Sequence, residues 1–483
     1  MTTDRLDDTG TCAHPGSDTG GGGTGGGGAG VARAVVAGAA GPLTLTVIIG
    51  LIWVGFVAPI AHFDIDVFLR AGAAVGDGQD PYPPPGTPEV YSGFAFVYPY
   101  LMSLPFVPLS ALPGADTVFI ALSVAALFAA CRLARAGWWT SALVLGASCT
   151  ITGLQMGTLN ALLFLGLVAL WRLRDTPVGA GAVAALLVYS KLFLLPVVLW
   201  LVLTRRSRAA GYAVAALAAL FAVGEIYSPV RAGTYADMLG VLAREEAPDG
   251  LSLTGLLMNT GLGAGTAAWA ARAAAGLLLV GCVVVARRSG RAAGDGLIFA
   301  ATVATALVAS PIVWSHYLLL LVAPLLAITR GSPVPPGDRR ARHPDRPLAV
   351  FTAGSWLLVT PHLSTPAELL AAAAILAPLV AVPLLRPAPP VPPTSAARRA
   401  TLVALAVTGI GAALWATARV HGDDQRVIGA YGALVGTVTL LVWACRRSGT
   451  SGSTTGSTAG STSTAATPAA GAPRTRTGRM HRR

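Results

Sequence analysis

The sequence predicts an all-α integral membrane protein with about 11–14 membrane helices. Of its 483 residues, 54% are hydrophobic and only 12% are charged, whereas about 25% of the residues in an ordinary soluble domain are charged. The apolar residues form many runs of about 12 to 27 residues, separated by short connectors rich in Arg or Pro. This pattern excludes a simple soluble enzyme.

Both ends of the chain are predicted to be disordered. Residues 1–31 are largely Gly, Ser, Thr and Asp, and residues 448–483 are largely Ser, Thr, Gly and Ala with a final cluster of arginines. Segments of this composition cannot bury a core. We expect both to be cytoplasmic tails, the second of them basic.

The first apolar run, Ala34–Ile60, is too long and starts too late for a cleaved signal peptide, so it is predicted to be the first membrane span. We expect a transmembrane core over residues 32–330 with external loops at 62–95 and 228–254, a cytoplasmic loop at 331–347, and C-terminal membrane helices within 348–447. The other candidate runs are Asp116–Ala134, Thr140–Met156, Leu159–Leu170, Val178–Tyr189, Leu192–Leu203, Tyr212–Tyr227, Ala267–Val285, Gly296–Trp314, Tyr317–Ile328, Leu348–Leu358, Leu369–Leu385, Leu402–Ala416 and Val427–Cys445.

The basic residues indicate the topology. The net charge of +12 could suggest nucleic acid, but the arginines stand in pairs and triplets at the ends of apolar runs. With the N-terminus in the cytoplasm, about 27 basic residues fall inside and about six outside, as the positive-inside rule requires. The partner is then the lipid bilayer, and nucleic acid drops out.

This topology needs two irregular segments. Phe96–Leu112 contains three prolines and is predicted to dip into the membrane as a hairpin, because prolines interrupt a straight span. Val178–Leu203 has arginines on both sides, so it must enter and return as two half-helices with an apex near Tyr189, Ser190 and Lys191. A broken helix at membrane depth is tolerated where it lines a cavity.

Unusual polar residues then collect on the external side. The two external loops contribute most of them, and the junctions Gly157–Asn160 and Ser310–His316 face the same way. We therefore expect one outer cavity. The five cysteines lie in a tail or in apolar runs, so no disulfide framework is predicted. His62, His316, Asp64 and Glu245 show no metal-ligand spacing, and we expect neither a metal nor another cofactor.

Several short motifs occur in order along the chain. They are Asp64-Ile65-Asp66-Val67-Phe68, Gly78-Gln79-Asp80-Pro81-Tyr82, Tyr98-Pro99, Gly157 with Asn160, Lys191 with Pro196, Ser252-Leu253, and Ser310 to His316. In their order and spacing they resemble the polyprenol-phosphate-mannose-dependent mannosyltransferases of glycosyltransferase family 87, within the GT-C superfamily. The resemblance spans Ile60 to about Pro324, roughly half the chain. Thr158, Gly250-Leu251 and Val313 depart from the usual motifs.

The resemblance implies that Asp64 is the catalytic base. A sugar hydroxyl is a poor nucleophile until a carboxylate removes its proton. Two alternatives remain: Asp64 caps a short juxtamembrane helix, or Asp66 is the base. On a helix the two side chains point about 200° apart, so they are not expected to act as a pair.

Lys191, His316 and Arg70 are the candidate ligands of a donor phosphate. An ammonium in an apolar run needs a partner, and a lipid phosphate would provide one. An internal ion pair or a snorkelling side chain would also explain Lys191. His316 could hydrogen-bond the departing phosphate, or it is an ordinary amphipathic residue at an interface. Arg70 could bind a phosphate or pair with Asp77.

The remaining candidates would contact the acceptor or a sugar. They are Asp66, Tyr82, Tyr98, Asn160, Glu245, Ser252 and Trp314. The aromatic residues, with Tyr317, could stack on sugar rings or anchor the chain at the membrane interface. Asn160 could hydrogen-bond a hydroxyl or satisfy a helix end, and Glu245 could instead belong to a solvated charged turn.

The resemblance thus implies an extracytoplasmic enzyme that moves mannose from a polyprenyl-phosphate donor to a glycolipid or glycan acceptor, with inversion and an α-1,2 linkage. It implies a GT-C-type fold and no metal. A transporter or flippase for a lipid-linked sugar is the alternative, because a broken helix and an intramembrane lysine suit that class too.

Overall fold

The computed structural model describes residues 41–60, 62–91, 95–289, 291–330, 346–358 and 424–450. Regular structure in these ranges is helical throughout, so the predicted all-α class is confirmed for the described part of the chain. Residues 1–31, most of 448–483, and the runs expected at Leu369–Leu385 and Leu402–Ala416 lie outside the described residues.

Among the described residues, three helices are long and apolar enough to cross a membrane: α4 (Ala115–Leu133), α10 (Ser207–Tyr227) and α13 (Ala264–Arg287). A helix of about 20 apolar residues matches the hydrocarbon thickness of a bilayer. Helices with shorter apolar stretches accompany them. These are Gly41–Val57, which ends in the π-helical η1 (Trp53–Val57), α7 (Asn160–Leu173), α8 (Pro177–Ser190), η4 (Leu192–Leu194) with α9 (Pro196–Leu203), α14 (Arg291–Ala309; apolar over Ala293–Ala309), η5 (Ser315–Leu321) with α15 (Val322–Arg330), and α19 (Asp424–Thr450; apolar over Gly429–Cys445). The chain is a membrane protein.

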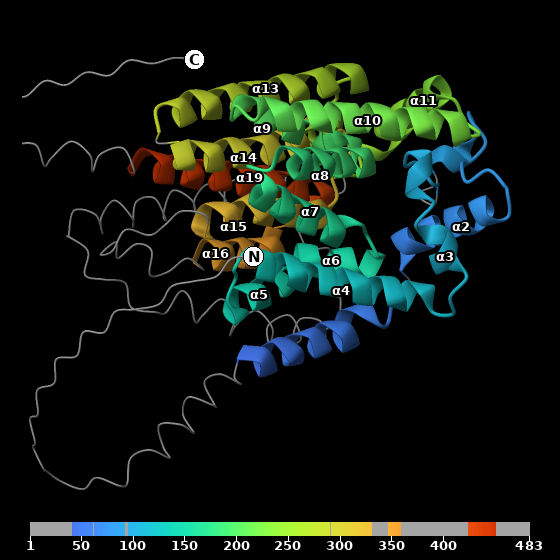
Figure 1. The fold of residues 1–483 in the computed structure, drawn as a ribbon, viewed down its shortest axis with the longest axis horizontal. Helices are drawn as coiled ribbons and strands as arrows, with labels where there is room; N and C mark the ends of the chain where they lie inside the picture. Colours follow the sequence, from blue (N-terminus) through green and yellow to red (C-terminus); the bar gives the residue numbers. More distant parts are fainter. Residues whose placement is uncertain are drawn as a thin grey trace, which may run out of the picture.

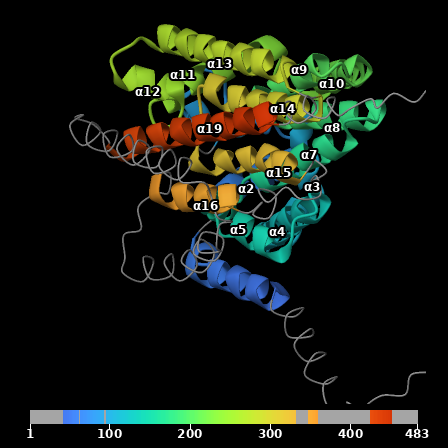
Figure 2. The ribbon, with the colours of Figure 1, turned by 90° about the vertical axis from the view of Figure 1, so that its left-hand side faces the viewer.

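The apolar helices lie side by side in a bundle (Figure 1). Within the bundle α13 packs against α14, α10 against α8, and α4 against α7. Figure 2 shows α19 crossing the bundle beside α14, above α15 and α16 (Arg346–Leu358). The end at the right of Figure 1 holds α2 (Phe63–Gly76), α3 (Phe106–Ser110) and α11 (Ala232–Glu246). Three further short elements are η2 (Pro88–Tyr91), η3 (Tyr100–Met102) and α12 (Leu253–Asn259).

The predicted break at Lys191 is confirmed. Helix α8 ends at Ser190, Lys191 is extended with φ −146° and ψ 100°, and the chain resumes as η4 and α9. Pro196 occupies the first turn of α9, where its missing N–H costs no hydrogen bond. Lys191 is the C-terminal cap of α8: its N–H still donates to the Leu187 carbonyl at 3.0 Å, and the helix does not continue beyond it.

The prediction of one continuous run over Thr140–Met156 is wrong. The chain forms α5 (Trp138–Leu145) and α6 (Ser148–Met156), separated at Gly146 and Ala147. Side chains of α16 satisfy the backbone groups that the break exposes. Trp356 donates to the Gly146 carbonyl at 2.8 Å, and Ser355 Oγ accepts from the Ser148 N–H at 3.2 Å. Long-range partners of this kind leave no local sequence signal.

The two predicted external loops are more regular than expected. The segment 228–254 contains the 15-residue helix α11, and the segment 62–95 contains the 14-residue helix α2. The Phe96–Leu112 segment, expected as a hairpin, consists of an extended stretch followed by η3 and α3. Helix α3 packs so closely on α2 that a Cβ at Gly72 would lie 2.5 Å from the Phe106 carbonyl carbon.

Candidate active site

The lysine at the helix break is held by two tyrosines. Lys191 Nζ donates to Tyr98 Oη at 2.6 Å and to Tyr317 Oη at 2.8 Å. The same nitrogen lies 4.5 Å from the centre of the Tyr98 ring and 4.9 Å from that of Tyr317, within the range of cation–π attraction. Residues far apart in sequence thus fix one ammonium group in position.

Aromatic packing fixes the tyrosines in turn. Phe193, two residues beyond the lysine, stacks on Tyr317 with ring centres 5.3 Å apart and planes 17° from parallel. Phe68 of α2 contacts Tyr98 at 4.5 Å. These rings restrict the rotamers of both phenols, so the hydroxyl groups stay aimed at Lys191. We name Lys191, Tyr98 and Tyr317 the lysine clamp.

Asp64 lies in the first turn of α2, close enough to Lys191 for the two charges to interact. It is not the helix cap, because His62 occupies that position and α2 has no side-chain cap; the capping alternative is wrong. The His62 ring nitrogen Nδ1 lies 2.9 Å from the carbonyl oxygen of Gln155 at the end of α6, which ties the start of α2 to that helix. Asp64 is partly buried, whereas Asp66 is exposed.

The charges of the site are coupled. Burial raises the pKa of the Asp64 carboxyl above its ordinary value, and the ammonium of Lys191 opposes the rise. A carboxylate with a raised pKa is a stronger base than a free one, as a residue that accepts a proton from a hydroxyl should be. Such a shift in a partly buried group is typical of functional sites.

His316 belongs to the same cluster. It follows Ser315 at the start of η5, is 6% exposed, and lies within electrostatic range of Lys191. Its ring packs edge-on against Tyr317 at 4.9 Å. A Cβ at Gly153 would lie 3.5 Å from His316 Cβ, so a glycine in α6 lets η5 approach. Lys191 and His316, both predicted as phosphate ligands, thus lie in the same region of the structure.

Asn160 is buried beside this cluster without hydrogen bonds for its amide. It is 1% exposed, and neither Oδ1 nor Nδ2 has a partner among the described residues. The preceding Gly157 has a φ of +70°, and a Cβ there would lie 2.7 Å from Ile65 Cγ2, next to Asp64. A buried amide without partners costs about 1–3 kcal/mol, so its retention points to a hydroxyl or water that binds it.

Tyr82 connects the lysine clamp to the segment 62–95. Its Oη donates to the Tyr98 carbonyl at 2.9 Å, and its N–H donates to Asp80 Oδ1 at 2.8 Å. Tyr235 of α11 packs against the Tyr82 ring at 6.0 Å and donates to the Val97 carbonyl at 3.0 Å. These bonds hold the irregular segment around Tyr98 in place.

Ser252 and Trp314 occupy a neighbouring structural junction. Ser252 Oγ accepts from the Gly255 N–H at 2.9 Å as the cap of α12 and donates to the Pro311 carbonyl at 2.6 Å. The Leu251 N–H donates to the Val313 carbonyl at 2.6 Å. These contacts give Ser252 a structural role in placing the Ser310–His316 segment. Trp314 is half-buried and packs on the hydrophobic core.

Three predicted site residues lie further out. Arg70 and Asp66 are exposed on α2, where Arg70 Nε donates to the Asp66 carbonyl at 3.3 Å. Glu245 is exposed near the end of α11, so it belongs to a helix and not to a turn. Among the described residues, no group of three His, Cys, Asp or Glu side chains is placed to hold a metal ion.

Tyr317 is the clamp residue that the sequence does not single out as a site residue, and Tyr98 is predicted to contact a sugar, not the phosphate. In the sequence Tyr317 is one of several aromatics beside an apolar run, and only the fold brings its hydroxyl to Lys191. Its position directly after the Ser310–His316 motif is the one local signal.

The chain resembles a known family over this region. A model of glycosyltransferase family 87 matches residues 96–311. The matched region includes Tyr98, Asn160, Lys191 and Ser252, while Asp64 precedes it and His316 follows it. No curated protein and no solved structure gives a match. With the apolar helices, the family match supports a glycosyltransferase of the hexosyl-transferring type in a membrane.

Proposed function

We propose that this chain is a multi-pass GT-C-type mannosyltransferase that uses polyprenyl-phosphate mannose. Its acceptor is a hydroxyl of a cell-envelope glycolipid or glycan, and its site faces the extracytoplasmic side. The observation that carries the proposal is the lysine clamp beside Asp64, which combines a fixed cation with a partly buried carboxylate.

The lysine clamp suits a phosphodiester. An ammonium has three protons, and two of them are donated to the tyrosines, so one remains for a ligand. Each phenol accepts from Nζ and keeps its own proton to donate. The clamp therefore offers three donors and one positive charge to an anion, and Lys191 is only partly buried, so that a ligand can reach it.

In the proposed reaction Asp64 removes the proton from the attacking hydroxyl. The hydroxyl oxygen bonds to the anomeric carbon on the face opposite the phosphate, which inverts a β-linked donor to an α-linked product, 1→2 by resemblance. The bond from the anomeric carbon to the phosphate oxygen breaks, and polyprenyl phosphate leaves as an anion. Lys191, Tyr98, Tyr317 and His316 stabilise the charge that develops on this leaving group.

Asn160 and the membrane helices complete this assignment. The unpartnered amide of Asn160 is available for a hydroxyl of the transferred sugar. The apolar outer surfaces of the bundle suit a polyprenyl tail lying in the bilayer. A nucleotide sugar is not required, because the donor reaches the site through the membrane.

A transport function is the second candidate, because a helix broken at a lysine also occurs in transporters. Asp64 and His316 both lie within electrostatic range of Lys191 and so form one site with it, which favours an enzyme that acts on one side of the membrane. The full chain, purified and placed in liposomes, is given polyprenyl-phosphate mannose labelled in the sugar together with mannosyl glycosides. We expect labelled product with an α-glycosidic bond, and none from GDP-mannose. Movement of label across the bilayer without a glycosidic product would overturn the transferase in favour of the transporter.

A further inference from the structure

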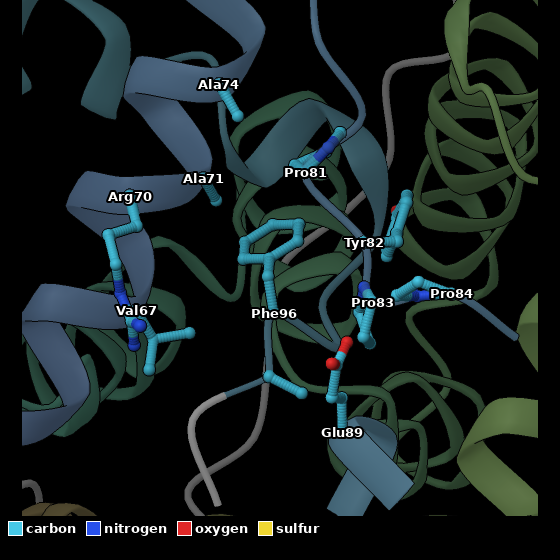
Figure 3. Close-up of a pocket in the computed structure, with 11 residues that line it drawn as sticks. Val67, Arg70, Ala71, Ala74, Pro81, Tyr82, Pro83, Pro84, Glu89 and Phe96 are labelled. Atoms are coloured by element: carbon cyan, nitrogen blue, oxygen red, sulfur yellow. The ribbon is translucent and has the colours of Figure 1, made fainter. Parts of the chain in front are cut away.

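An external pocket of about 380 Å³ lies between α2 and residues 81–96 (Figure 3). Its volume falls in the range of about 300–1,000 Å³ that small-molecule sites occupy. One wall is formed by α2, and the other by the proline-rich segment with Tyr82, Phe96 and Glu89. The lysine clamp and Asp64 do not line it, so it is a separate space.

The geometry of α2 connects this pocket to Asp64. Ala71 and Ala74, which line the pocket, follow Asp64 by seven and ten residues on the same helix. At 100° per residue, Ala71 points within about 20° of the direction of Asp64 and lies roughly 10 Å further along the axis. Ala74 points about 80° away from that direction, and the buried ring of Phe68 packs on Phe96 between Asp64 and the pocket. A ligand with one hydroxyl at Asp64 would therefore have to pass outside the Phe68 ring to place further rings in the pocket.

The lining of the pocket suits a sugar ring. The flat apolar surfaces come from Phe96, Tyr82 and the prolines 81, 83 and 84. Arg70 and Glu89 stand on opposite sides of the Phe96 ring in Figure 3. Sugars present C–H faces that stack on such rings and hydroxyls that hydrogen-bond to charged side chains. One cation balanced by one carboxylate favours a neutral ligand over a polyanion.

Tyr82 links the wall of the pocket to the reaction centre. Its ring lines the pocket, while its hydroxyl donates to the carbonyl of Tyr98, whose side chain binds Lys191. Its hydrogen bonds and its contact with Phe96 at 5.5 Å hold this wall in one conformation. A preformed wall reduces the entropy cost of binding a ring.

We infer that this pocket is a subsite for the second and third sugar rings of a neutral oligosaccharide acceptor. The inference rests on the proposed function, which places the first acceptor ring at Asp64. The enzyme then recognises a glycan of several residues and favours it over a single sugar.

The test compares acceptors of one and three rings with the full-length chain. The probes are methyl α-D-mannopyranoside and the methyl glycoside of α-linked mannotriose, with labelled polyprenyl-phosphate mannose as donor. Ala74→Trp fills the pocket, and Ala73→Trp is the matched control, because Ala73 is exposed and does not line it. We expect the wild type to use the trisaccharide at least about tenfold better in kcat/KM, a gain that stacking and two hydrogen bonds can supply.

Ala74→Trp should abolish that preference through KM and leave the monosaccharide reaction unchanged, and Ala73→Trp should keep the preference. Equal use of both acceptors by the wild type, or an intact preference in Ala74→Trp, would overturn the subsite and leave the proposed function standing. Saturation-transfer NMR with the trisaccharide gives a readout without turnover. If no acceptor is glycosylated, binding that Ala74→Trp alone removes supports the subsite, and binding unaffected by Ala74→Trp refutes it.

Discussion

The lysine clamp and the pocket between α2 and residues 81–96 are joined through Tyr82, but they differ in rigidity and in exposure. In the clamp, two short hydrogen bonds hold the ammonium of Lys191, and two aromatic contacts hold the tyrosines that make them. The pocket is lined by a helix face, prolines and two exposed charged residues. In the proposed reaction the donor phosphate does not vary, so a rigid site suits it. An acceptor can vary in length, and a pocket at the surface accommodates that.

The largest effect is expected at the centre of the clamp. Lys191→Met keeps the length of the side chain but removes the charge and three N–H donors. We expect kcat/KM for the lipid donor to fall about 100-fold or more, as when a donor to a developing anion is removed. The comparison variant is Arg231→Met, an exposed residue 77% accessible in its side chain, which should leave the rate unchanged. A Lys191→Met enzyme that folds and keeps its donor kinetics contradicts the phosphate role.

Asn160→Leu separates a substrate contact from a structural one. The substitution replaces an unpartnered buried amide by an apolar side chain of similar size, so the free energy of unfolding should stay equal or rise by about 1 kcal/mol. Transfer should fall about tenfold because the sugar loses a hydrogen bond. The thermal unfolding midpoint and the turnover rate are measured on the same preparation. A lower midpoint together with unchanged turnover would show that Asn160 acts only in folding.

Tyr317→Phe gives a smaller effect and tests the clamp's second phenol. The ring and its stacking on Phe193 remain, while one acceptor of the Lys191 ammonium and one donor to the phosphate are lost. We expect donor kcat/KM to fall about tenfold, the value of one hydrogen bond to a charged group. Unchanged donor kinetics would mean that Tyr317 only packs against the lysine.

The smallest effect is a shift in pH dependence. Burial raises the pKa of Asp64 and Lys191 opposes it, so activity should decline on acidification at a higher pH than an ordinary aspartate would give. In Lys191→Met the opposing charge is gone, and the acid limb of kcat/KM should move to still higher pH. The raised pKa also means that Asp64 favours the folded state at low pH and loses that contribution as pH rises through its folded value. If the acid limb of kcat/KM does not move in Lys191→Met, the charge of Lys191 does not influence the pKa of Asp64.

The sequence predicts the features that depend on local chemistry. The all-α class follows from apolar composition, and the break near Lys191 follows from the arginine groups on both sides of Val178–Leu203. The partial burial of Asp64 and the exposure of Asp66 agree with their opposite directions on a helix.

Other features depend on contacts between distant residues, which no local pattern records. The break at Gly146 is satisfied by Trp356, more than 200 residues away. Tyr317 reaches Lys191 across 126 residues. Helix α11 was expected as a loop because its sequence contains several charged residues. In the structure it forms a helix that packs beside η2. Ser252 matches a motif, but its hydroxyl hydrogen-bonds to the backbone of Gly255 and Pro311.

The most direct test of the central claim compares Asp64→Asn with Asp66→Asn in the transfer assay. Both variants remove one carboxylate from the same helix turn, and only Asp64 is partly buried near Lys191. We predict that Asp64→Asn lowers kcat by about 100-fold or more, the usual contribution of a general base, while Asp66→Asn stays near the wild type. Full transfer by a folded Asp64→Asn enzyme would contradict the account.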